Sequence, residues 1–235
     1  AINGLVPLAR FHLADVRPAI RARRRRRRDD VLSHLIAAGH STSDILVECV
    51  TYGTAGMVTT REFISMACWH LLTDRELAAE YLAAEQPRRL EILEEIIRLE
   101  PVVGHLFRRA QDDIEITAPG GTVTVPAGDL IDICVRATNT DEQAVGPTPQ
   151  SLCPLRSTAD SVPAVGMSFS DGAHKCPGQT LALFETDALL HRLLDRSPTL
   201  VAEPTIGWDS VIEGYRLRGL ELAFPQEPAR EGRRS

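Results

Sequence analysis

Apolar residues recur at helical spacing over much of the first hundred residues of the chain. Leu90, Leu93 and Ile97, for example, lie on one side of a helix that Pro101 would end. Serine, threonine and aspartate residues stand where such helices would begin, as capping residues do. The pattern predicts helices over residues 31–38, 43–72, 74–85 and 88–100.

Further along the chain the apolar positions recur at every second residue, which is typical of strands. Ile114, Ile116, Val123 and Val125 alternate with polar residues, and the Gly-Gly pair between them supplies a turn. The same alternation returns over residues 131–135, and a long irregular region follows over residues 138–168. A helix is predicted over residues 177–194, and weak strands over residues 199–202 and 214–223. The pattern predicts a mainly α fold with a small antiparallel β unit.

Composition narrows the class of protein. Of 235 residues, 43% are hydrophobic and 25% charged, which are ordinary values for a globular protein. Because no apolar run approaches the roughly 20 residues that a bilayer requires, we expect no membrane span in this chain. The net charge of −6 argues against a nucleic-acid partner. The five cysteines form no CxxC pair, so we expect a cytoplasmic protein in which any important cysteine acts singly.

A block of arginines stands near the start of the chain. Arg23 to Arg28 are consecutive, and such blocks are typically solvated helix faces or loops. A patch for nucleic acid or anionic lipid is the alternative interpretation. We expect residues 1–28 to be a separate remnant or linker, residues 29–227 to be the main folded part and residues 228–235 to be a flexible tail.

The candidate chemistry lies in one loop, Phe169-Ser-Asp-Gly-Ala-His-Lys-Cys-Pro-Gly178. Pro177 suits the first position of a helix, so Cys176 would lie at a helix N-terminus, where backbone N–H groups favour a thiolate. Gly172 and Gly178 would let the backbone approach a flat, bulky group, and Phe169 would keep water from the sulfur. A buried structural cysteine and a nucleophilic or redox cysteine are the alternatives.

This pattern, FxxGxHxCxG, resembles the haem-binding loop of the cytochrome P450 family. The resemblance implies that Cys176 is the axial thiolate ligand of the iron in haem b (iron protoporphyrin IX) and that His174 contacts a haem propionate. Thiolate is a strong electron donor that favours cleavage of the O–O bond. Phe169, Gly172 and Gly178 then border the cofactor.

Other stretches resemble this family in the same order. Glu95-Ile-Ile-Arg98 is similar to its ExxR pair, and Arg156, in an irregular region before the loop, is similar to the third member of that structural triad. A carboxylate between two guanidinium groups can satisfy its oxygens with bidentate bonds. Arg108, rather than Arg109, matches the arginine that pairs with a propionate.

The centre of the predicted helix 43–72 resembles the oxygen-binding turn of the family. On that resemblance Ala55 and Gly56 lie over the haem face, and Thr59 hydrogen-bonds dioxygen or a water. Val58 stands where the family usually has Asp or Glu, and valine cannot relay a proton. We therefore expect slow or uncoupled dioxygen activation, or a substrate that supplies the missing group.

The resemblance implies the C-terminal portion of the cytochrome P450 fold, about half of the family's usual length. It implies a haem-thiolate monooxygenase, or a C-terminal fragment of one, that inserts one oxygen atom into a small lipophilic or secondary-metabolite substrate. Electrons would come from NAD(P)H through a ferredoxin- or flavin-type donor. The alternative is a truncated, non-catalytic remnant or interaction module that binds haem weakly or not at all.

Overall fold

The computed structural model describes residues 2–118 and 120–225, so the tail expected from residue 228 onward lies outside the described residues. The chain forms two compact units that are divided between Val58 and Thr59. This boundary differs from the one expected after residue 28. The reason is packing, because Val16 and Ile20 are buried in one cluster with Ile45, which joins the arginine-rich segment to the helices that follow it.

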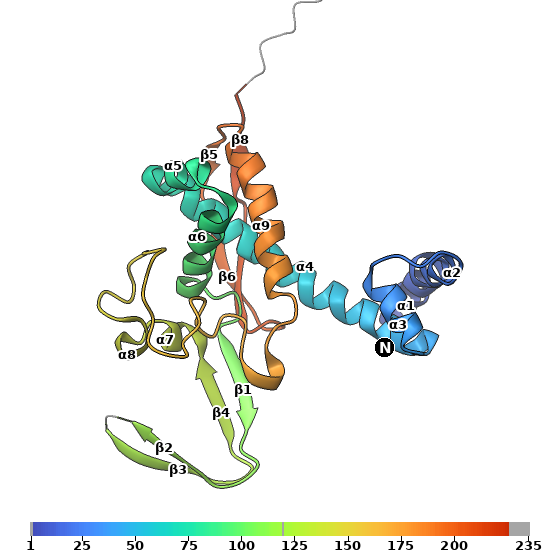
Figure 1. Cartoon of the computed structure of the whole chain (residues 1–235), viewed down its shortest axis with the longest axis horizontal. Helices are drawn as coiled ribbons and strands as arrows, with labels where there is room; N and C mark the ends of the chain where they lie inside the picture. Colours follow the sequence, from blue (N-terminus) through green and yellow to red (C-terminus); the bar gives the residue numbers. More distant parts are fainter. Residues whose placement is uncertain (1, 119, 226–235) are drawn as a thin grey trace, which may run out of the picture. The chain divides into compact units, whose positions relative to one another are not determined.

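The first unit is helical, and Figure 1 labels its elements. Asp30 caps the third helix by accepting a hydrogen bond from the Ser33 backbone N–H at 2.9 Å. The helices are α1 (Ile2–Phe11), a π-helical turn (His12–Val16), α2 (Arg17–Arg25), α3 (Val31–Ala37) and the first part of α4 (Thr42–Thr73). Helices α3 and α4 were predicted to within about a residue, whereas α1 was not foreseen.

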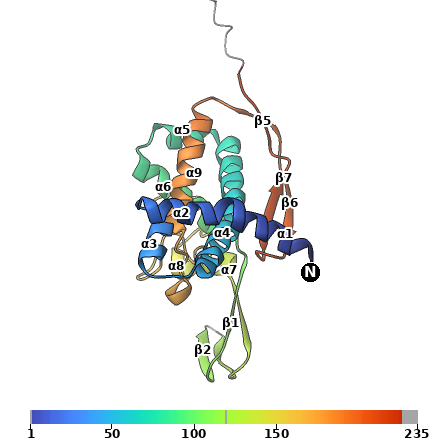
Figure 2. The same cartoon turned by 90° about the vertical axis from the view of Figure 1, so that its right-hand side faces the viewer.

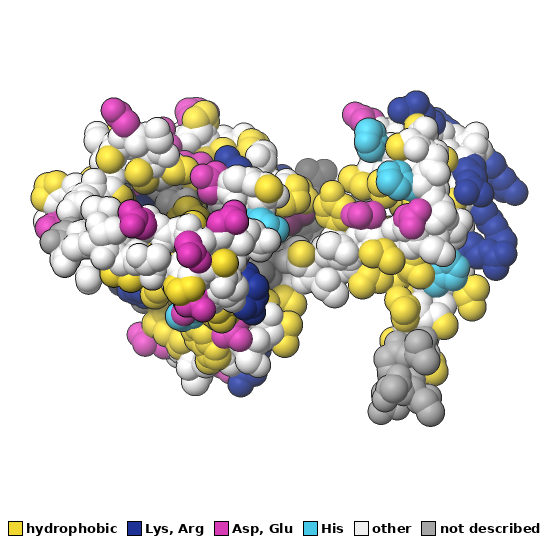
Figure 3. All heavy atoms as spheres, turned by 90° about the horizontal axis from the view of Figure 1, so that it is seen from below, with side chains coloured by type: hydrophobic (Ala, Val, Ile, Leu, Met, Phe, Trp, Pro, Cys, Tyr) yellow, Lys and Arg dark blue, Asp and Glu magenta, His cyan; other side chains and the backbone are white. Residues whose placement is uncertain are grey.

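The arginine block runs from the end of α2 into the segment before α3. Arg24 to Arg28 are exposed, and Figure 3 shows arginine side chains gathered on one side of this unit. Arg23 forms an ion pair with Asp30, and its hydrogen bond is the main cause that lowers the pKa of Asp30 to about 2. The block is therefore a solvated surface, as expected, with one arginine tied to the cap of α3.

The second unit is built around three helices that pack together and against the second part of α4. Helices α6 and α9 run side by side, as Figures 1 and 2 show, and α5 contacts both. Ile92, Leu93, Ile96, Ile97 and Leu190 are at most 3% exposed in the core between them. The helices are α5 (Arg75–Ala83), α6 (Gln86–Leu99) and α9 (Gln179–Leu194).

A buried carboxylate joins these three helices. Asp187 of α9 accepts hydrogen bonds from the Tyr81 hydroxyl at 2.7 Å, from Arg89 Nε at 2.7 Å and from Gln86 Nε2 at 3.1 Å. Burial alone would raise the pKa of Asp187, but the bonds from Arg89, Tyr81 and Gln86 outweigh it and lower the pKa below 3.8. The charge is thus fully partnered inside the core.

Within residues 59–118 and 120–225, the strands of the second unit form four antiparallel pairs. The β2–β3 hairpin lies at the far end of the β1–β4 pair (Figures 1 and 2). The pairs are β1 (His105–Arg109) with β4 (Leu130–Cys134), β2 (Ile114–Ala118) with β3 (Gly121–Val125), β5 (Thr199–Ala202) with β8 (Glu221–Ala223), and β6 (Thr205–Asp209) with β7 (Gly214–Arg218). A mainly α fold with small antiparallel sheets is confirmed, although β1 and β6 were not predicted.

The irregular region contains two short helices that were not predicted, α7 (Val135–Asn139) and α8 (Glu142–Val145). From Gly146 to Asp171 the chain forms turns that end at a 3-10 turn, η2 (Gly172–His174). None of the helices within the described residues is long and apolar enough to cross a membrane.

Candidate functional site

The loop that carries Cys176 is closed on itself by backbone hydrogen bonds. The Cys176 N–H donates to the carbonyl of Phe169 at 2.8 Å, and the Lys175 N–H donates to the carbonyl of Gly172 at 3.1 Å. Phe169 is buried in the core of the second unit, and Cys176 packs against that core. The sulfur is thus held at the end of a loop whose other end is anchored among apolar side chains.

Two glycines shape this loop differently. Gly172 has φ of +61°, a left-handed conformation that favours glycine, and no described atom lies within 4 Å of where its Cβ would be. A Cβ on Gly178 would lie 3.7 Å from the Cys176 sulfur, which is an ordinary contact. The backbone at Gly172 therefore presents an open face that a flat group could approach.

Helix α9 begins at Gln179, with Gly178 as its N-cap residue, so the helix starts two residues later than predicted. Pro177 and Gly178 form a turn, and the carbonyl of Gly178 accepts the bond from the Ala182 N–H at 2.9 Å. Cys176 consequently precedes the helix cap and is half-buried at the helix start.

Arg108 reaches this loop from strand β1. Its Nη2 donates to the Ser170 Oγ at 3.0 Å. Arg109, the next residue of the strand, points elsewhere and donates to the carbonyl of Gly128. Because successive side chains of a strand point to opposite sides, one of the two arginines is directed to the cysteine loop, and it is Arg108. His174 is exposed at the end of η2.

The structure brings Glu95, Arg98 and Arg156 together. Arg98 is fully buried and binds both carboxylate oxygens of Glu95, with Nε–Oε2 and Nη2–Oε1 distances of 2.6 and 2.7 Å. The Nε of Arg156 lies 3.2 Å from Oε1 of Glu95, which also accepts the Cys153 N–H at 2.9 Å. The remaining donors of both guanidinium groups bind backbone carbonyls of the irregular region, of residues 139, 145, 147, 148, 149 and 151.

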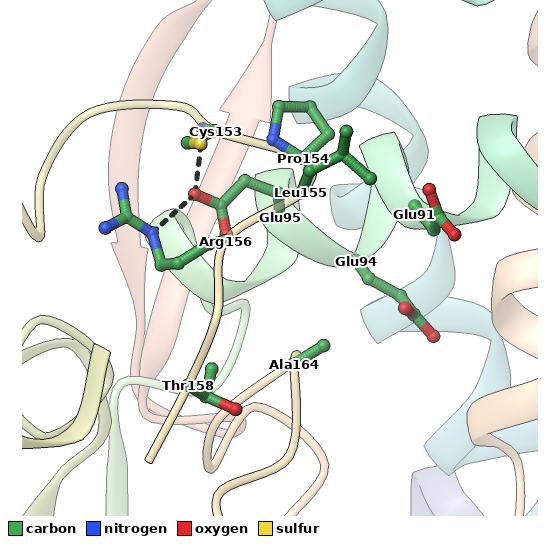
Figure 4. A pocket seen from close by; sticks show the side chains of 9 residues that line it. All are labelled: Glu91, Glu94, Glu95, Cys153, Pro154, Leu155, Arg156, Thr158 and Ala164. Atoms are coloured by element: carbon green, nitrogen blue, oxygen red, sulfur yellow. Dashed lines mark hydrogen bonds and ion pairs between the residues drawn. The ribbon is translucent and has the colours of Figure 1, made fainter. Parts of the chain in front are cut away.

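A hollow of about 320 Å³ opens beside this triad. Figure 4 shows Glu95 and Arg156 with Cys153 on one side of it and Glu91 and Glu94 on the other. Burial, followed by the charge of Glu91, raises the pKa of Glu94. The hollow borders the triad rather than the Cys176 loop, and we assign it no chemistry.

Asn139 is a polar residue that the sequence analysis did not single out, yet it is 1% exposed. Its side chain binds the backbone of Arg98 and two residues of the segment that leads into the cysteine loop, Met167 and Ser168. A lone asparagine in a polar stretch carries no sequence signal of this role, because only the fold brings its partners together.

Ala55 and Gly56 lie near the end of the first unit, at exposed positions of α4, and Thr59 is the first residue of the second unit. The helix continues through the run of glycines and threonines, and the Thr54 hydroxyl donates back to the carbonyl of Val50 at 2.8 Å. The expected roles of Ala55, Gly56 and Thr59 at a haem face stay predictions.

Comparisons with known proteins identify the family. Residues 90–202 match the sequence model of the family described as Cytochrome P450. The chain is 32% identical over 216 residues to Cytochrome P450 130 of Mycobacterium tuberculosis, covering 87% of this chain and 50% of that protein. It is 30% identical to the 20-oxo-5-O-mycaminosyltylactone 23-monooxygenase of Streptomyces fradiae, covering 83% of this chain and 44% of that protein.

Solved structures show the same fold. CYP164A2 of Mycobacterium smegmatis, determined with econazole bound, is 29% identical, with a TM-score of 0.68 over 91% of this chain and 52% of that chain. CYP108D1 of Novosphingobium aromaticivorans is 27% identical, with a TM-score of 0.75 over 95% of this chain and 52% of that chain. The chain thus spans about half the length of the relatives it matches, and it belongs to the cytochrome P450 family as the C-terminal portion of that fold.

Proposed function

We propose that this chain supplies the thiolate side of a haem b site in a monooxygenase, in which Cys176 would hold the iron. The observation that carries the proposal is the closed loop, in which the Cys176 N–H binds the carbonyl of buried Phe169 at 2.8 Å. This loop presents a half-buried sulfur at the start of α9. Membership of a family whose other proteins include a named monooxygenase supports the reaction class.

The residues of the loop fit a haem. The donor set is a single cysteine thiolate, the type of ligand that P450 haem iron takes. The left-handed backbone at Gly172 leaves an open face on the same loop. Arg108 contacts the loop at Ser170 and can supply positive charge for a propionate. We assign the second propionate contact to His174.

When bound, a thiolate-ligated haem supplies the activation of dioxygen, with O–O cleavage favoured by the electron-rich sulfur. The chain's own residues hold and shield that centre. Cys176 would hold the iron, and Phe169, in the core against which Cys176 packs, would keep water from the sulfur, while Gly178 lies close to that sulfur. We assign to Thr59 the holding of a proton or a water through its hydroxyl, and to Ala55 and Gly56 the helix positions just before it.

Glu62 does not replace the acid that Val58 lacks. Its carboxylate is buried and accepts bonds from the Leu217 N–H at 2.7 Å, from Arg218 at 2.8 Å and from Arg61 at 2.6 Å. Burial would raise the pKa of Glu62, but these bonds outweigh it and lower the pKa. A carboxylate held by three partners in its charged form is a poor proton donor, so Glu62 has a structural role.

We infer a small lipophilic or secondary-metabolite substrate, in keeping with the 20-oxo-5-O-mycaminosyltylactone named for the Streptomyces fradiae relative. Electrons would pass from NAD(P)H through a ferredoxin- or flavin-type donor. The five cysteines are free thiols, which supports a reducing, cytoplasmic setting. A P450 in complex with an acyl carrier protein is among the matching structures.

The test is haem loading of the protein and of two variants. Loaded protein, reduced and exposed to carbon monoxide, should show the red-shifted Soret band of thiolate ligation. Cys176→Ser should abolish that band, whereas Cys134→Ser, which changes an exposed cysteine of the same unit, should retain it. Protein that folds but retains no haem would overturn the proposal and favour the non-catalytic remnant.

A further inference from the structure

Arg98 and Asn139 hold each other by a reciprocal pair of hydrogen bonds. Arg98 Nη1 donates to the backbone carbonyl of Asn139 at 2.7 Å, and the Nδ2 of Asn139 donates to the backbone carbonyl of Arg98 at 2.9 Å. Both residues are at most 1% exposed. Asn139, the last residue of α7, is therefore held directly by a member of the ion-pair triad in the last turn of α6.

The amide of Asn139 is also bound to the segment that leads into the cysteine loop. Its Oδ1 accepts the Met167 N–H at 2.7 Å, and its Nδ2 donates to the Ser168 Oγ at 2.9 Å. Ser168 in turn donates to the carbonyl of Ile97 at 2.7 Å. Both N–H donors of the amide and one lone pair of its oxygen are thus used, which fixes the orientation of the amide.

Gly166 is required by this arrangement. It has φ of +56°, and a Cβ there would lie 2.2 Å from the Oδ1 of Asn139. Glycine therefore allows the backbone to adopt a left-handed conformation and to pass directly over the amide. The close approach shows that the asparagine and this backbone segment are packed as one piece.

The segment held by Asn139 continues into the cysteine loop within three residues. The carbonyl of Met167 accepts the Ser170 N–H at 2.9 Å, and the carbonyl of Phe169 accepts the Cys176 N–H at 2.8 Å. Each bond fixes the distance between two backbone groups of this segment. Together with the bond from the Met167 N–H to the Asn139 Oδ1, these bonds connect the amide of Asn139 to the backbone that carries the sulfur.

We propose that Asn139 is a positioning residue that sets the place of the Cys176 sulfur by holding residues 166–168 against the end of α6. The inference rests on the proposed function for its consequence, because a correctly placed sulfur matters only if it binds iron. Residues that orient a metal ligand from outside the coordination sphere typically contribute about 10- to 100-fold to affinity or activity. The three hydrogen bonds of this amide would act on the ligand through the backbone of residues 167–170.

The experiment compares Asn139→Asp with the unchanged protein. Aspartate has the same shape and still accepts the Met167 N–H, but it cannot donate to Arg98 or Ser168. We expect haem affinity to fall by about 10-fold, with part of the carbon monoxide complex losing the red-shifted band. In the haem-free protein, alkylation of Cys176 by iodoacetamide, read by peptide mass, should speed up while that of Cys134 stays unchanged.

Two controls separate positioning from a general loss of stability. Leu190→Ala opens a cavity in the core between the helices, at a fully buried residue near the far end of α9 from the loop. It should lower the stability without changing the ratio of Cys176 to Cys134 alkylation. Gln143→Ala, at an exposed position of α8, should change neither quantity.

The outcomes distinguish this inference from the proposed function. If Asn139→Asp leaves both the alkylation ratio and the haem spectrum unchanged in a protein that binds haem through thiolate, the inference is overturned alone. An alkylation ratio that changes no more than in a Leu190→Ala protein of equal stability also overturns it. If the unchanged protein binds no haem but Asn139→Asp still raises Cys176 alkylation, positioning stands and the proposed function falls.

Discussion

Arg108 and Ser170 are joined by a hydrogen bond of 3.0 Å between Nη2 and Oγ, although they lie 62 residues apart in the chain. Ser170 has φ of +58°, so its backbone is in the left-handed region. The contact ties strand β1 to the cysteine loop at a residue whose conformation is unusual. The contact also distinguishes Arg108 from Arg109, which binds the carbonyl of Gly128 and not the cysteine loop.

Replacing Arg108 by alanine should weaken haem binding. A guanidinium bound to a propionate forms charge-assisted hydrogen bonds, and their loss at this partly exposed position should cost about 1.4 kcal/mol, or about 10-fold in the dissociation constant. Haem titration followed by absorbance measures the change. Arg109→Ala is the matched control and should bind haem as the unchanged protein does, so equal losses in the two variants would contradict the assignment.

Replacing Glu95 by alanine should destabilise the fold strongly. Arg98 is fully buried, and without Glu95 its charge has no carboxylate partner, which typically costs about 3–5 kcal/mol. Urea unfolding followed by circular dichroism measures the difference. Glu94→Ala is the control: it removes from the same helix a carboxylate that has its pKa raised by burial. This change should alter the free energy of unfolding by no more than about 0.5 kcal/mol.

The stability that Asp187 contributes should disappear in acid. Its pKa in the folded state lies below the ordinary 3.8, because the bonds from Arg89, Tyr81 and Gln86 outweigh burial. A lowered pKa means that the folded state favours the carboxylate, so the contribution is complete above 3.8 and is lost as the pH falls through the folded-state value. The difference in urea midpoint between the protein and Asp187→Asn should therefore shrink toward zero across that window. A difference that is independent of pH would show that the charge does not matter.

Periodicity predicted the elements in which apolar residues recur at regular spacing along the sequence. Helix α6 and the β2–β3 hairpin are examples, and the structure places both where the pattern did. It did not predict β1, because in His105 to Arg109 two adjacent apolar residues are followed by two arginines, and it did not predict β6, where only Ile206 and Trp208 alternate with other residues. Those strands form because their partners β4 and β7 supply the register, which a local pattern cannot show.

The same limit applies to the site. The loop around Cys176, the Glu95–Arg98 pair and Arg156 could be found by residue spacing, since each has a specific sequence pattern. Asn139 could not, because its partners are the carbonyl of Arg98 and the backbone and side chain of residues 167 and 168, and such contacts exist only after folding. The helix start was also placed two residues early, because Pro177 suits either a first helical position or a turn.

Replacing Val58 by aspartate should raise the amount of product formed per NAD(P)H consumed. Val58 directly precedes Thr59, the residue assigned to hold a proton or a water, and a carboxylate there can relay the protons that valine cannot. Glu62 is held in its charged form by Leu217, Arg218 and Arg61, so the native chain has no substitute at that turn. Product and hydrogen peroxide, measured against NAD(P)H in haem-loaded protein with its electron donor, should show coupling that rises by up to about 10-fold. Val58→Asn has the same shape as Val58→Asp but carries no acid. Coupling that rises equally in both variants would show that the gain comes from a polar side chain and not from proton relay.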